Sequence, residues 1–307
     1  MIPYTRTPNS FITVDGTEIA SFVSASDGNM DADTVQSFGD EWNTFSSFTG
    51  EDIQKAGEQY FDIVTGDMLG PQSKVLDIGC GTGRWSKFLS AKVGFIEAID
   101  PSSAVIPAAR LVSGNPGIRI TQCGVGNIPF PDASFDFVFS LGVMHHLPDT
   151  QDAISKAVEK LKPGGHFLIY LYYSLDNRSV FFKMLFFPVH ILRMIIHPLP
   201  HSVKKIVCDL LAVFLYLPMI SLARAIHFLF PRKSWYKKIP LSYYWDKNFK
   251  IIRNDALDRL GTPLEKRFSR KLIEIMLTNA GLTEIVFSEN EPFWHAVGKK
   301  KFKLPTS

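Results

Sequence analysis

The sequence predicts an α/β protein whose core is a doubly wound, mostly parallel sheet. Short apolar segments alternate with helical patterns over residues 73–174, at the interval expected of parallel strands joined by crossover helices. The first apolar segment, residues 74–78, runs directly into three glycines at alternate positions. The chain has 307 residues and is 46% hydrophobic, which is ample for a packed core.

The first 72 residues predict two segments that precede this core. Residues 1–35 have few apolar runs and many Ser, Thr, Asp and Gly, so we expect an extended leader with a short hairpin around Asp15-Gly16. Residues 36–72 have apolar side chains at helical spacing and predict a helical cap. Trp42 and Tyr60 in this cap are candidate substrate contacts, with packing of the cap on the sheet as the alternative role.

Residues 74–83 predict a loop that binds a nucleotide-containing cofactor. Gly79, Gly81 and Gly83 let the backbone turn sharply and approach a ligand closely. Their spacing, Gly-x-Gly-x-Gly, differs from the Gly-x-Gly-x-x-Gly of dinucleotide-binding folds. Asp77 lies two residues before the first glycine, where its carboxylate can orient the loop and bind a cationic amino group.

The next apolar segment, residues 95–100, predicts a second strand that ends in an acid. Asp100 can accept hydrogen bonds from both hydroxyls of a ribose. The same arrangement serves nicotinamide dinucleotides, so Asp100 alone does not identify the cofactor.

Two later motifs complete the pattern. Residues 134–149 form an apolar strand followed by Gly-Val-Met-His-His-Leu-Pro-Asp, and residues 161–170 form a Leu-Lys-Pro-Gly-Gly turn that enters another strand. Together with the glycine loop and Asp100, they resemble the class I S-adenosylmethionine-dependent methyltransferases, in the small-molecule branch with this fourth-strand motif. The resemblance implies a Rossmann-like sheet of seven strands and S-adenosylmethionine as cofactor. It also implies that two final strands, within residues 251–307, form an antiparallel hairpin beside the parallel sheet. We expect no metal site, because the three cysteines lie at unrelated spacings.

The resemblance assigns roles to individual residues of this chain. His145 and His146 are candidates for a general base, because the near-neutral pKa of histidine suits removal of a proton from a hydroxyl or a protonated amine. Capping a helix or packing beside the cofactor is their alternative role. Arg84 and Tyr172 join Trp42 and Tyr60 as candidate substrate residues. The residues expected to hold the cofactor are Asp77, Gly79, Cys80, Gly81, Gly83, Asp100, Pro101, Ser102, Gly124, Val125, Ser140 and Leu141.

One position departs from the family pattern. Many relatives place an acid after the third strand to accept the adenine amino group, and Gly124 occupies that position here. We expect adenine to be held by backbone groups near Gly124 and Val125, by Asn127, or in a displaced pose. Loss of one neutral hydrogen bond lowers affinity by only about 0.5–1.5 kcal/mol, so the cofactor assignment stands.

A basic and apolar insertion, residues 175–250, interrupts the core. Residues 178–250 contain 12 Lys or Arg and two acids, a charge of +10, whereas the whole chain carries +3. Prolines within it predict several short apolar helices. The longest uncharged stretch, residues 210–223, has 14 residues and contains Pro218, whereas a membrane span needs roughly 20. A lid over the substrate pocket, a hairpin in a membrane interface and a true span remain open.

Two segments beside the insertion are rich in aromatic and polar residues. Residues 240–245 and 254–265 could contact substrate or only form packed turns. Because the basic insertion is interleaved with aliphatic residues instead of stacking aromatics, nucleic acid is the least favoured partner.

These observations predict a cytoplasmic enzyme, because the N-terminus lacks the features of a signal peptide and three cysteines give no disulfide framework. We expect methyl transfer to oxygen of a small, amphipathic, lipid-linked or glycan-linked acceptor, with nitrogen and carbon as alternative atoms. Peripheral membrane contact through residues 179–238 belongs to the same hypothesis. Two alternatives stay open: non-methylating S-adenosylmethionine chemistry such as cyclisation or decarboxylation, and a non-catalytic cofactor-binding module recruited to a membrane.

Overall fold

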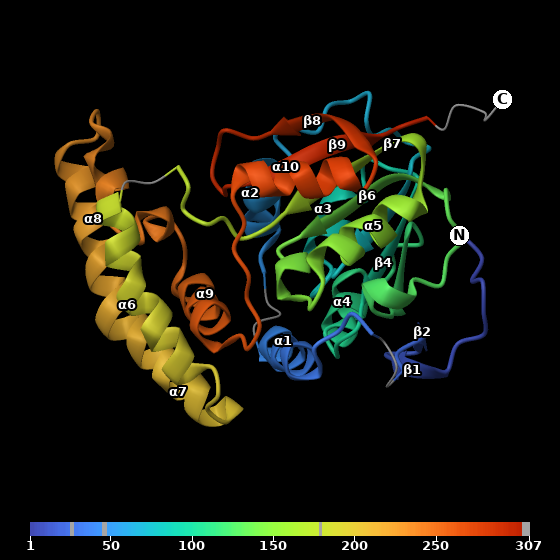
Figure 1. The fold of residues 1–307 in the computed structure, drawn as a ribbon. Helices are drawn as coiled ribbons and strands as arrows, with labels where there is room; N and C mark the ends of the chain where they lie inside the picture. Colours follow the sequence, from blue (N-terminus) through green and yellow to red (C-terminus); the bar gives the residue numbers. More distant parts are fainter. Residues whose placement is uncertain (25–27, 45–47, 178–179, 303–307) are drawn as a thin grey trace. The chain divides into compact units, whose positions relative to one another are not determined.

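The computed structural model describes residues 1–24, 28–44, 48–177 and 180–302, and it divides into two compact units. Unit 1 comprises Met1–Asn177 and Leu264–Ser307, and unit 2 comprises Arg178–Pro263 (Figure 1). The predicted insertion of residues 175–250 falls largely in unit 2. Unit 2 continues to Pro263 because helix α9 (Phe249–Gly261) packs against the preceding helices α6 and α7.

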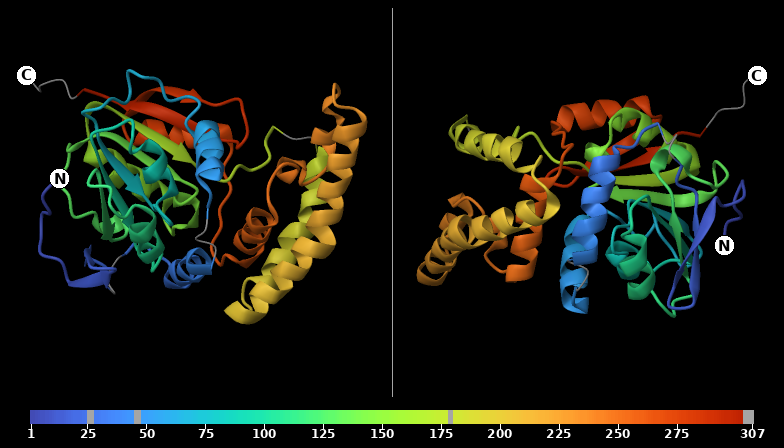
Figure 2. Two further views of the ribbon diagram at one scale, coloured as in Figure 1. Left: turned by 180° about the vertical axis from the view of Figure 1, so that it is seen from behind. Right: turned by 90° about the horizontal axis from the view of Figure 1, so that it is seen from below.

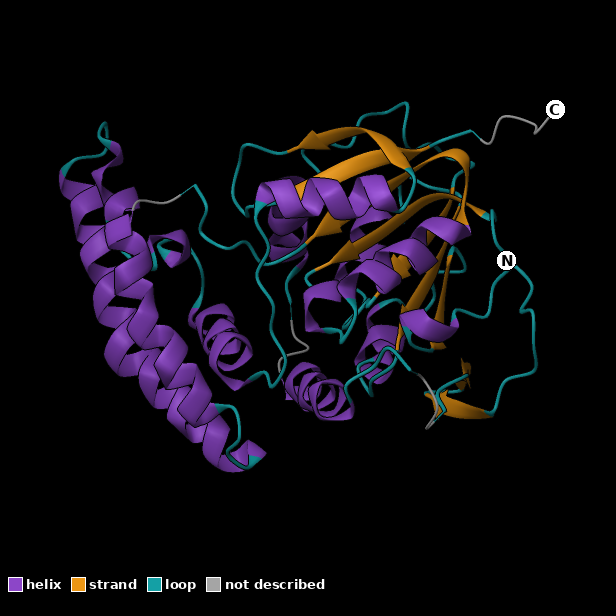
Figure 3. Cartoon of the chain, viewed as in Figure 1, coloured by secondary structure: helices purple, strands orange, loops and turns teal. Residues whose placement is uncertain are grey.

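Unit 1 is built on one sheet, to which nine strands belong among the described residues (Figure 3). The strand order is β1-β2-β5-β4-β3-β6-β7-β9-β8. The pairs from β2 to β7 in this order are parallel, and β1–β2, β7–β9 and β9–β8 are antiparallel. The strands are β1 (Ser10–Val14), β2 (Thr17–Ser21), β3 (Lys74–Ile78), β4 (Phe95–Asp100), β5 (Ile118–Gln122), β6 (Phe135–Leu141), β7 (Leu161–Tyr170), β8 (Leu282–Phe287) and β9 (His295–Lys300).

The predicted seven strands are present, and the expected hairpin adds two more. Asp15 and Gly16 adopt φ angles of 47° and 83°, as an Asp-Gly hairpin turn requires. β2 then pairs with β5, so the leader is not simply extended but lengthens the sheet at one edge. The predicted boundary between leader and cap is also shifted, because helix α1 begins at Ala32.

Helices cover both faces of this sheet (Figure 2). Several of them start at residues whose side chains accept a hydrogen bond from the first turn: Thr49 before α2, Asp149 before α5 and Ser269 before α10. The helical elements of unit 1 are α1 (Ala32–Thr44), α2 (Gly50–Tyr60), α3 (Arg84–Leu89), α4 (Val105–Leu111), α5 (Thr150–Lys160) and α10 (Arg270–Asn279), with 3₁₀ turns η1 (Val125–Asn127) and η2 (Met144–His146).

The direction of the crossovers reverses between β3 and β6, which are neighbours in the sheet. The residues of both strands are almost fully buried, because helices cover both of their faces. In such a sheet, ligands bind outside the carboxyl ends of the strands at the point of reversal. The ends of β3, β4 and β6 therefore define where the site is expected.

Unit 2 consists of long helices, so the prediction of several short ones is wrong. α7 (His201–Leu211), the π-helical turn η3 (Ala212–Tyr216) and α8 (Leu217–Leu229) form one continuous helix, Ser202–Leu229. Pro218 lies in the first turn of α8, just after the π turn, where its missing N–H costs the helix little. By length and composition alone, this helix of 28 residues, with mean hydropathy 2.2 in its most apolar window, is sufficient to cross a membrane.

The remaining elements of unit 2 form a small core against this helix. Helix α6 (Val180–Ile196) contains Pro188 within its span, and two 3₁₀ turns, η4 (Ser234–Lys238) and η5 (Ser242–Tyr244), follow α8. α9 contacts both α6 and α7 (Figure 2). The buried apolar cluster comprises Ala212, Tyr216, Ile220, Tyr244, Ile252 and Ala256.

Candidate cofactor and acceptor site

The glycine loop follows β3 and turns back over the neighbouring strand. The backbone N–H groups of Gly79 and Cys80 both donate to the carbonyl oxygen of Ile99, at 2.8 and 2.9 Å. Gly79 adopts a φ of 75°, and a Cβ there would lie 2.4 Å from a methyl carbon of Val143. Gly81 has a φ of 52° and lies beneath Trp42 of α1, whose ring nitrogen would be 3.4 Å from a Cβ. Only glycine allows this backbone path without strain or collision.

Asp77 lies buried beneath the loop. Its Oδ2 accepts a hydrogen bond from the Ser86 hydroxyl at 2.7 Å, whereas its Oδ1 has no partner within the described parts of the chain. Burial raises the pKa of Asp77 to about 7, and the nearby charge of Asp100 adds to that effect. A buried carboxylate with one unused oxygen is well suited to receive a cationic group from a ligand.

Asp100 ends β4 and faces the same loop. Its Oδ2 accepts from the backbone N–H of Gly81 at 3.0 Å, and its Oδ1 accepts from the N–H and hydroxyl of Ser102 at 2.9 and 2.6 Å. Burial raises the pKa of this carboxyl too. These three donors fix the orientation of the side chain at the strand end, and each oxygen retains acceptor capacity for a hydroxyl.

The position expected for adenine lies after β5 and β6. Gly124 precedes the turn η1, in which Val125 is buried, and Leu141 is buried at the end of β6. Arg6 donates to both the side-chain and main-chain oxygens of Asn127, at 2.9 Å each. The amide oxygen of Asn127 is thus already bound by Arg6, which favours the backbone near Gly124 and Val125 as the adenine contact.

The two histidines lie in η2, directly after β6, and both are buried. Nδ1 of His146 lies 2.7 Å from the carbonyl oxygen of Leu264, which can only accept a hydrogen bond. Nδ1 therefore carries the proton, and Nε2 carries the lone pair in the neutral ring. The ring edge also meets Phe38 of α1, at 4.8 Å between centroids.

His145 has a different environment. Neither ring nitrogen has a hydrogen-bond partner within the residues that the structure describes. Burial, reinforced by the charges of His146 and Arg267, holds the pKa of His145 well below its ordinary 6.5. Its ring stacks on Tyr172 with 3.9 Å between centroids. His145 is therefore a neutral ring at physiological pH and a weaker base than an ordinary histidine.

An aromatic cluster extends from these histidines towards the cap. Tyr172 lies 6.0 Å from Tyr170, which is 5.2 Å from Tyr60 of α2, and Tyr60 in turn is 5.0 Å from Trp85. The Arg84 guanidinium lies over the rings of Trp42 and Trp85, at 5.0 and 4.5 Å. The four predicted substrate residues, Trp42, Tyr60, Arg84 and Tyr172, thus belong to one cluster of ring contacts, in which Tyr170 and Trp85 link them.

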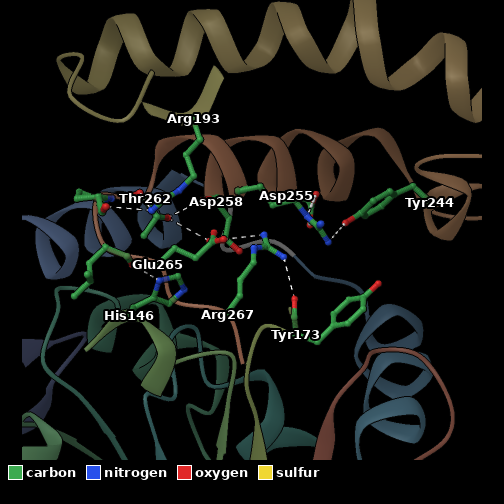
Figure 4. Close-up of polar contacts among 12 residues, drawn as sticks. His146, Tyr173, Arg193, Tyr244, Asp255, Asp258, Thr262, Glu265 and Arg267 are labelled. Carbon is green, nitrogen blue, oxygen red and sulfur yellow. Dashed lines mark hydrogen bonds and ion pairs between the residues drawn. The ribbon is translucent and has the colours of Figure 1, made fainter. Parts of the chain in front are cut away.

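Arg267 lies at the Tyr172 end of this cluster of ring contacts. It pairs with Glu265 at 2.7 Å and donates to the carbonyl oxygen of Tyr173 at 3.4 Å (Figure 4). Its guanidinium also lies 5.6 Å from the centre of the Tyr172 ring. The positive charge that disfavours protonation of His145 is therefore held in place by Glu265, two residues before Arg267, and by Tyr173, three residues after the end of β7.

The comparisons with known proteins decide the family. Residues 76–169 match the model of the methyltransferase domain. This domain belongs to the class I S-adenosylmethionine-dependent methyltransferases. The match covers the glycine loop, Asp100, the histidine pair and β7 as far as Ile169.

Several curated proteins share similarity with the methyltransferase domain. An uncharacterized methyltransferase of Mycobacterium tuberculosis is 32% identical over 111 residues, 36% of this chain and 56% of that protein. The probable tRNA methyltransferase 9B of Homo sapiens is 35% identical over 116 residues, 37% of this chain and 24% of that protein. The botryococcene C-methyltransferase of Botryococcus braunii is 32% identical over 114 residues, 36% of this chain and 30% of that protein. The chain thus spans about half the length, or less, of these relatives.

Similarity to solved structures is lower. A putative methyltransferase of Bacillus halodurans has a TM-score of 0.46 and 14% identity, covering 82% of this chain and all of that one.

The residues of the methyltransferase domain fit S-adenosylmethionine. Asp77 Oδ1 and Thr82 Oγ1 are buried polar atoms with no hydrogen-bond partner among the described residues, and both belong to the glycine-loop region. Such atoms are costly unless a ligand or water satisfies them. The cofactor has a cationic amino group and a ribose, which match Asp77 and Asp100. No cluster of three or more potential metal ligands occurs in the described ranges, and the three cysteines are buried and form no disulfide there.

The sequence predicted most of the candidate site residues but not the residues that hold them in position. Ser140 and Cys80 are buried, and the Ser140 hydroxyl donates to the Ile78 carbonyl at 3.0 Å, which joins β6 to β3 instead of leaving the hydroxyl for a ligand. The missed residues are Thr82, Trp85, Ser86, Tyr170 and Arg267. Trp85 and Ser86 directly follow the loop in helix α3, so their position offered a signal; Arg267 lies far away in sequence and offered none.

Proposed function

We propose that the methyltransferase domain transfers a methyl group from S-adenosylmethionine to an oxygen of a small, amphipathic, lipid-linked or glycan-linked acceptor. One arrangement of side chains supports this proposal. A buried acid under a glycine loop, a second acid at the next strand end and a histidine with a defined tautomer all lie at or just beyond the carboxyl ends of β3, β4 and β6. That edge is where ligands bind in sheets of this kind.

When bound, S-adenosylmethionine supplies an electrophilic methyl group on a sulfonium. Asp77 Oδ1 would receive the amino group, and the pKa of Asp77 would fall as that positive charge approaches. Asp100, held by Gly81 and Ser102, would accept the ribose hydroxyls. Because methyl transfer needs mainly alignment, these contacts supply much of the rate by positioning.

On the acceptor side, Nε2 of His146 is the candidate general base. The hydrogen bond from Nδ1 to Leu264 fixes the ring orientation and would stabilise the imidazolium that forms when Nε2 takes a proton. A hydroxyl acceptor needs such a base more than a nucleophilic carbon does, and this favours oxygen over carbon. His145, with its low pKa, would pack beside the acceptor and orient it.

The cluster of aromatic rings from Tyr172 to Trp42 favours an acceptor with an apolar part. Tyrosine and tryptophan offer large contact area with one polar group each. Relatives include a probable tRNA methyltransferase and a botryococcene C-methyltransferase, by their names. Each match covers about a third of this chain, so these relatives do not select between acceptors. Three buried cysteines that form no disulfide among the described residues support assignment to a reducing compartment, the cytoplasm.

A turnover assay tests this proposal. The purified protein, supplied with S-adenosylmethionine and a panel of amphipathic phenols, alcohols and lipid-linked sugars, should release S-adenosylhomocysteine together with a product heavier by one methyl group. Product mass analysis locates the methylated atom as oxygen, nitrogen or carbon. Tight cofactor binding without consumption across the panel would assign the domain to binding alone. A changed product without the methyl increment would assign it to cyclisation or decarboxylation.

A further inference from the structure

One side of the helix Ser202–Leu229 is apolar and exposed. Residues buried on the other side, Lys204, Cys208, Ala212, Tyr216 and Ile220, recur every four positions and pack towards α9 and η5. The exposed apolar residues recur at intervals of three and four, as one helical stripe does, and Phe214 among them is 75% exposed. They are Val203, Ile206, Leu210, Val213 and Phe214.

A second exposed group, aromatic and basic, lies at the end of the same helix, and the exposed Leu215 and Leu222 lie between it and the stripe. Phe228 and Leu229 are 84% and 65% exposed, and Phe230 packs on Trp235 with 5.1 Å between ring centroids. The Lys233 amine lies 4.3 Å from the centre of the Trp235 ring. Arg232, Lys233 and Lys237 are exposed around these rings. Contiguous exposed apolar side chains that are bordered by polar groups mark interaction sites with proteins or membranes.

The charges of this region specify an anionic partner. No Asp or Glu occurs between Asp209 and Asp246, and Arg253 pairs with Asp209, with a hydrogen bond of 2.7 Å from Nε to Oδ1. Unit 2, residues 178–263, contains 14 Lys or Arg and four acids, a charge of +10. Each exposed Lys or Arg near an anionic membrane surface adds to binding, and tryptophan prefers the headgroup level.

The packing of unit 2 favours a surface-bound helix over a spanning one. The buried side of the helix belongs to the core that includes Ile252 and Ala256 of α9. Spanning would therefore either break this core or draw α9 into the bilayer with its Arg253, Asp255 and Arg259. Only the exposed stripe is available to lipid without such a cost.

We propose that the outer stripe of Ser202–Leu229, together with residues 228–237, docks unit 2 onto an anionic membrane surface, with Trp235 at the headgroup level and Arg232, Lys233 and Lys237 on acidic headgroups. The helix lies in the interface and does not cross the bilayer. This inference concerns unit 2 and does not depend on the proposed chemistry, because docking is measured without turnover.

Flotation of the full-length protein with vesicles tests it. We expect binding to phosphatidylcholine vesicles that contain 30% phosphatidylserine, little binding to pure phosphatidylcholine, and loss of binding as salt rises. The triple variant Arg232→Glu, Lys233→Glu, Lys237→Glu should bind at least about 100-fold more weakly. The matched control Lys55→Glu, Lys271→Glu, Lys301→Glu makes the same charge change on exposed residues of unit 1 and should bind like the wild type.

Tryptophan fluorescence gives a readout at the residue itself. Anionic vesicles with brominated acyl chains should quench the wild-type protein, and Trp235→Phe should lose most of that quenching while still floating with the vesicles. Absence of binding to anionic vesicles would overturn the proposal. So would equal binding by the triple variant, concentration-dependent dimerisation lost in Phe214→Ser, or carbonate-resistant retention in membranes. The last two results would identify a second copy of the chain or a true span as the occupant.

Discussion

Unit 1 and unit 2 use their apolar residues in opposite ways. Unit 1 buries them in two large clusters on the two faces of its sheet. Unit 2 has a buried cluster of only a few residues and leaves a full helical stripe exposed. Their charges differ as well, since unit 2 carries +10 and the whole chain +3, which leaves −7 on unit 1. The contrast is the one that our two proposals expect, with unit 1 positioning a ligand at the sheet edge and unit 2 contacting a membrane surface.

The largest expected effect concerns the proposed base in unit 1. His146→Gln should lower kcat by about 10²–10⁴-fold, because no group then accepts the acceptor proton. The affinity for S-adenosylhomocysteine should not change, since the ring contacts Leu264 and Phe38 and not the glycine loop. Steady-state kinetics beside calorimetry measures both. Unaltered turnover would assign His146 to packing.

The glycine loop predicts the next largest effect. Gly79→Ala places a Cβ at positive φ and 2.4 Å from Val143, a combined cost of about 3 kcal/mol to the loop in this conformation. The loop must shift to relieve this cost, so cofactor affinity should fall by up to roughly 100-fold. Adding Val143→Ala should restore part of the affinity. Gly66→Ala, where no atom lies within 4 Å of a Cβ, is the control. Equal affinity in all three variants would show that the loop backbone is not the binding element.

Asp77 predicts a pH effect on stability. Burial raises its pKa from 3.8 to about 7, so the folded protein holds a proton that the unfolded chain has lost between these values. The free energy of unfolding of the cofactor-free protein should therefore fall as pH rises from about 4 to about 7. Asp77→Asn should remove this slope and be more stable than the wild type at pH 8, by up to about 4 kcal/mol.

Thermal melts at pH 4.5 and pH 8 check this expectation, with the exposed Asp33→Asn as control. Asp77→Asn should at the same time weaken S-adenosylhomocysteine binding, because the amide lacks the charge that receives the amino group. A variant that is less stable than the wild type at pH 8 would contradict the assignment of an uncompensated buried carboxyl.

The smallest effect on the site should come from unit 2. Ile252→Ala removes a fully buried side chain from its small core and should destabilise that core by about 2–5 kcal/mol. Hydrogen exchange should rise in α7, α8 and α9 and stay unchanged in the sheet. Affinity for S-adenosylhomocysteine should also be retained. Faster exchange across both units would show that they unfold together.

The methyltransferase domain was predictable because its signals are local. The glycine loop, Asp100 and the histidine pair each follow a strand, and the strand order then brings them to one edge. Leu264, which sets the tautomer of His146, and Arg267, whose charge adds to the effect of burial on the pKa of His145, lie beyond unit 2 in the sequence. Their role depends on tertiary contact and leaves no local pattern.

Unit 2 was harder to predict because its helices depart from local rules. Pro218 indicated a helix break, but a π turn before it lets the backbone continue. The short hairpin at Asp15-Gly16 was expected, but its pairing with β5 was not, because strand pairing at an edge depends on residues far away in sequence. When a helix is apolar on all sides, its sequence does not tell which side is buried, because that depends on the element packed against it.

Calorimetric titration with S-adenosylhomocysteine tests the central claim most directly. The wild-type protein should bind it and not NAD, and Asp100→Ala should bind it at least about tenfold more weakly, because hydrogen bonds from the ribose to a charged acceptor are lost. Absence of S-adenosylhomocysteine binding, or equal affinity in the wild type and Asp100→Ala, would contradict the cofactor site at the ends of β3 and β4.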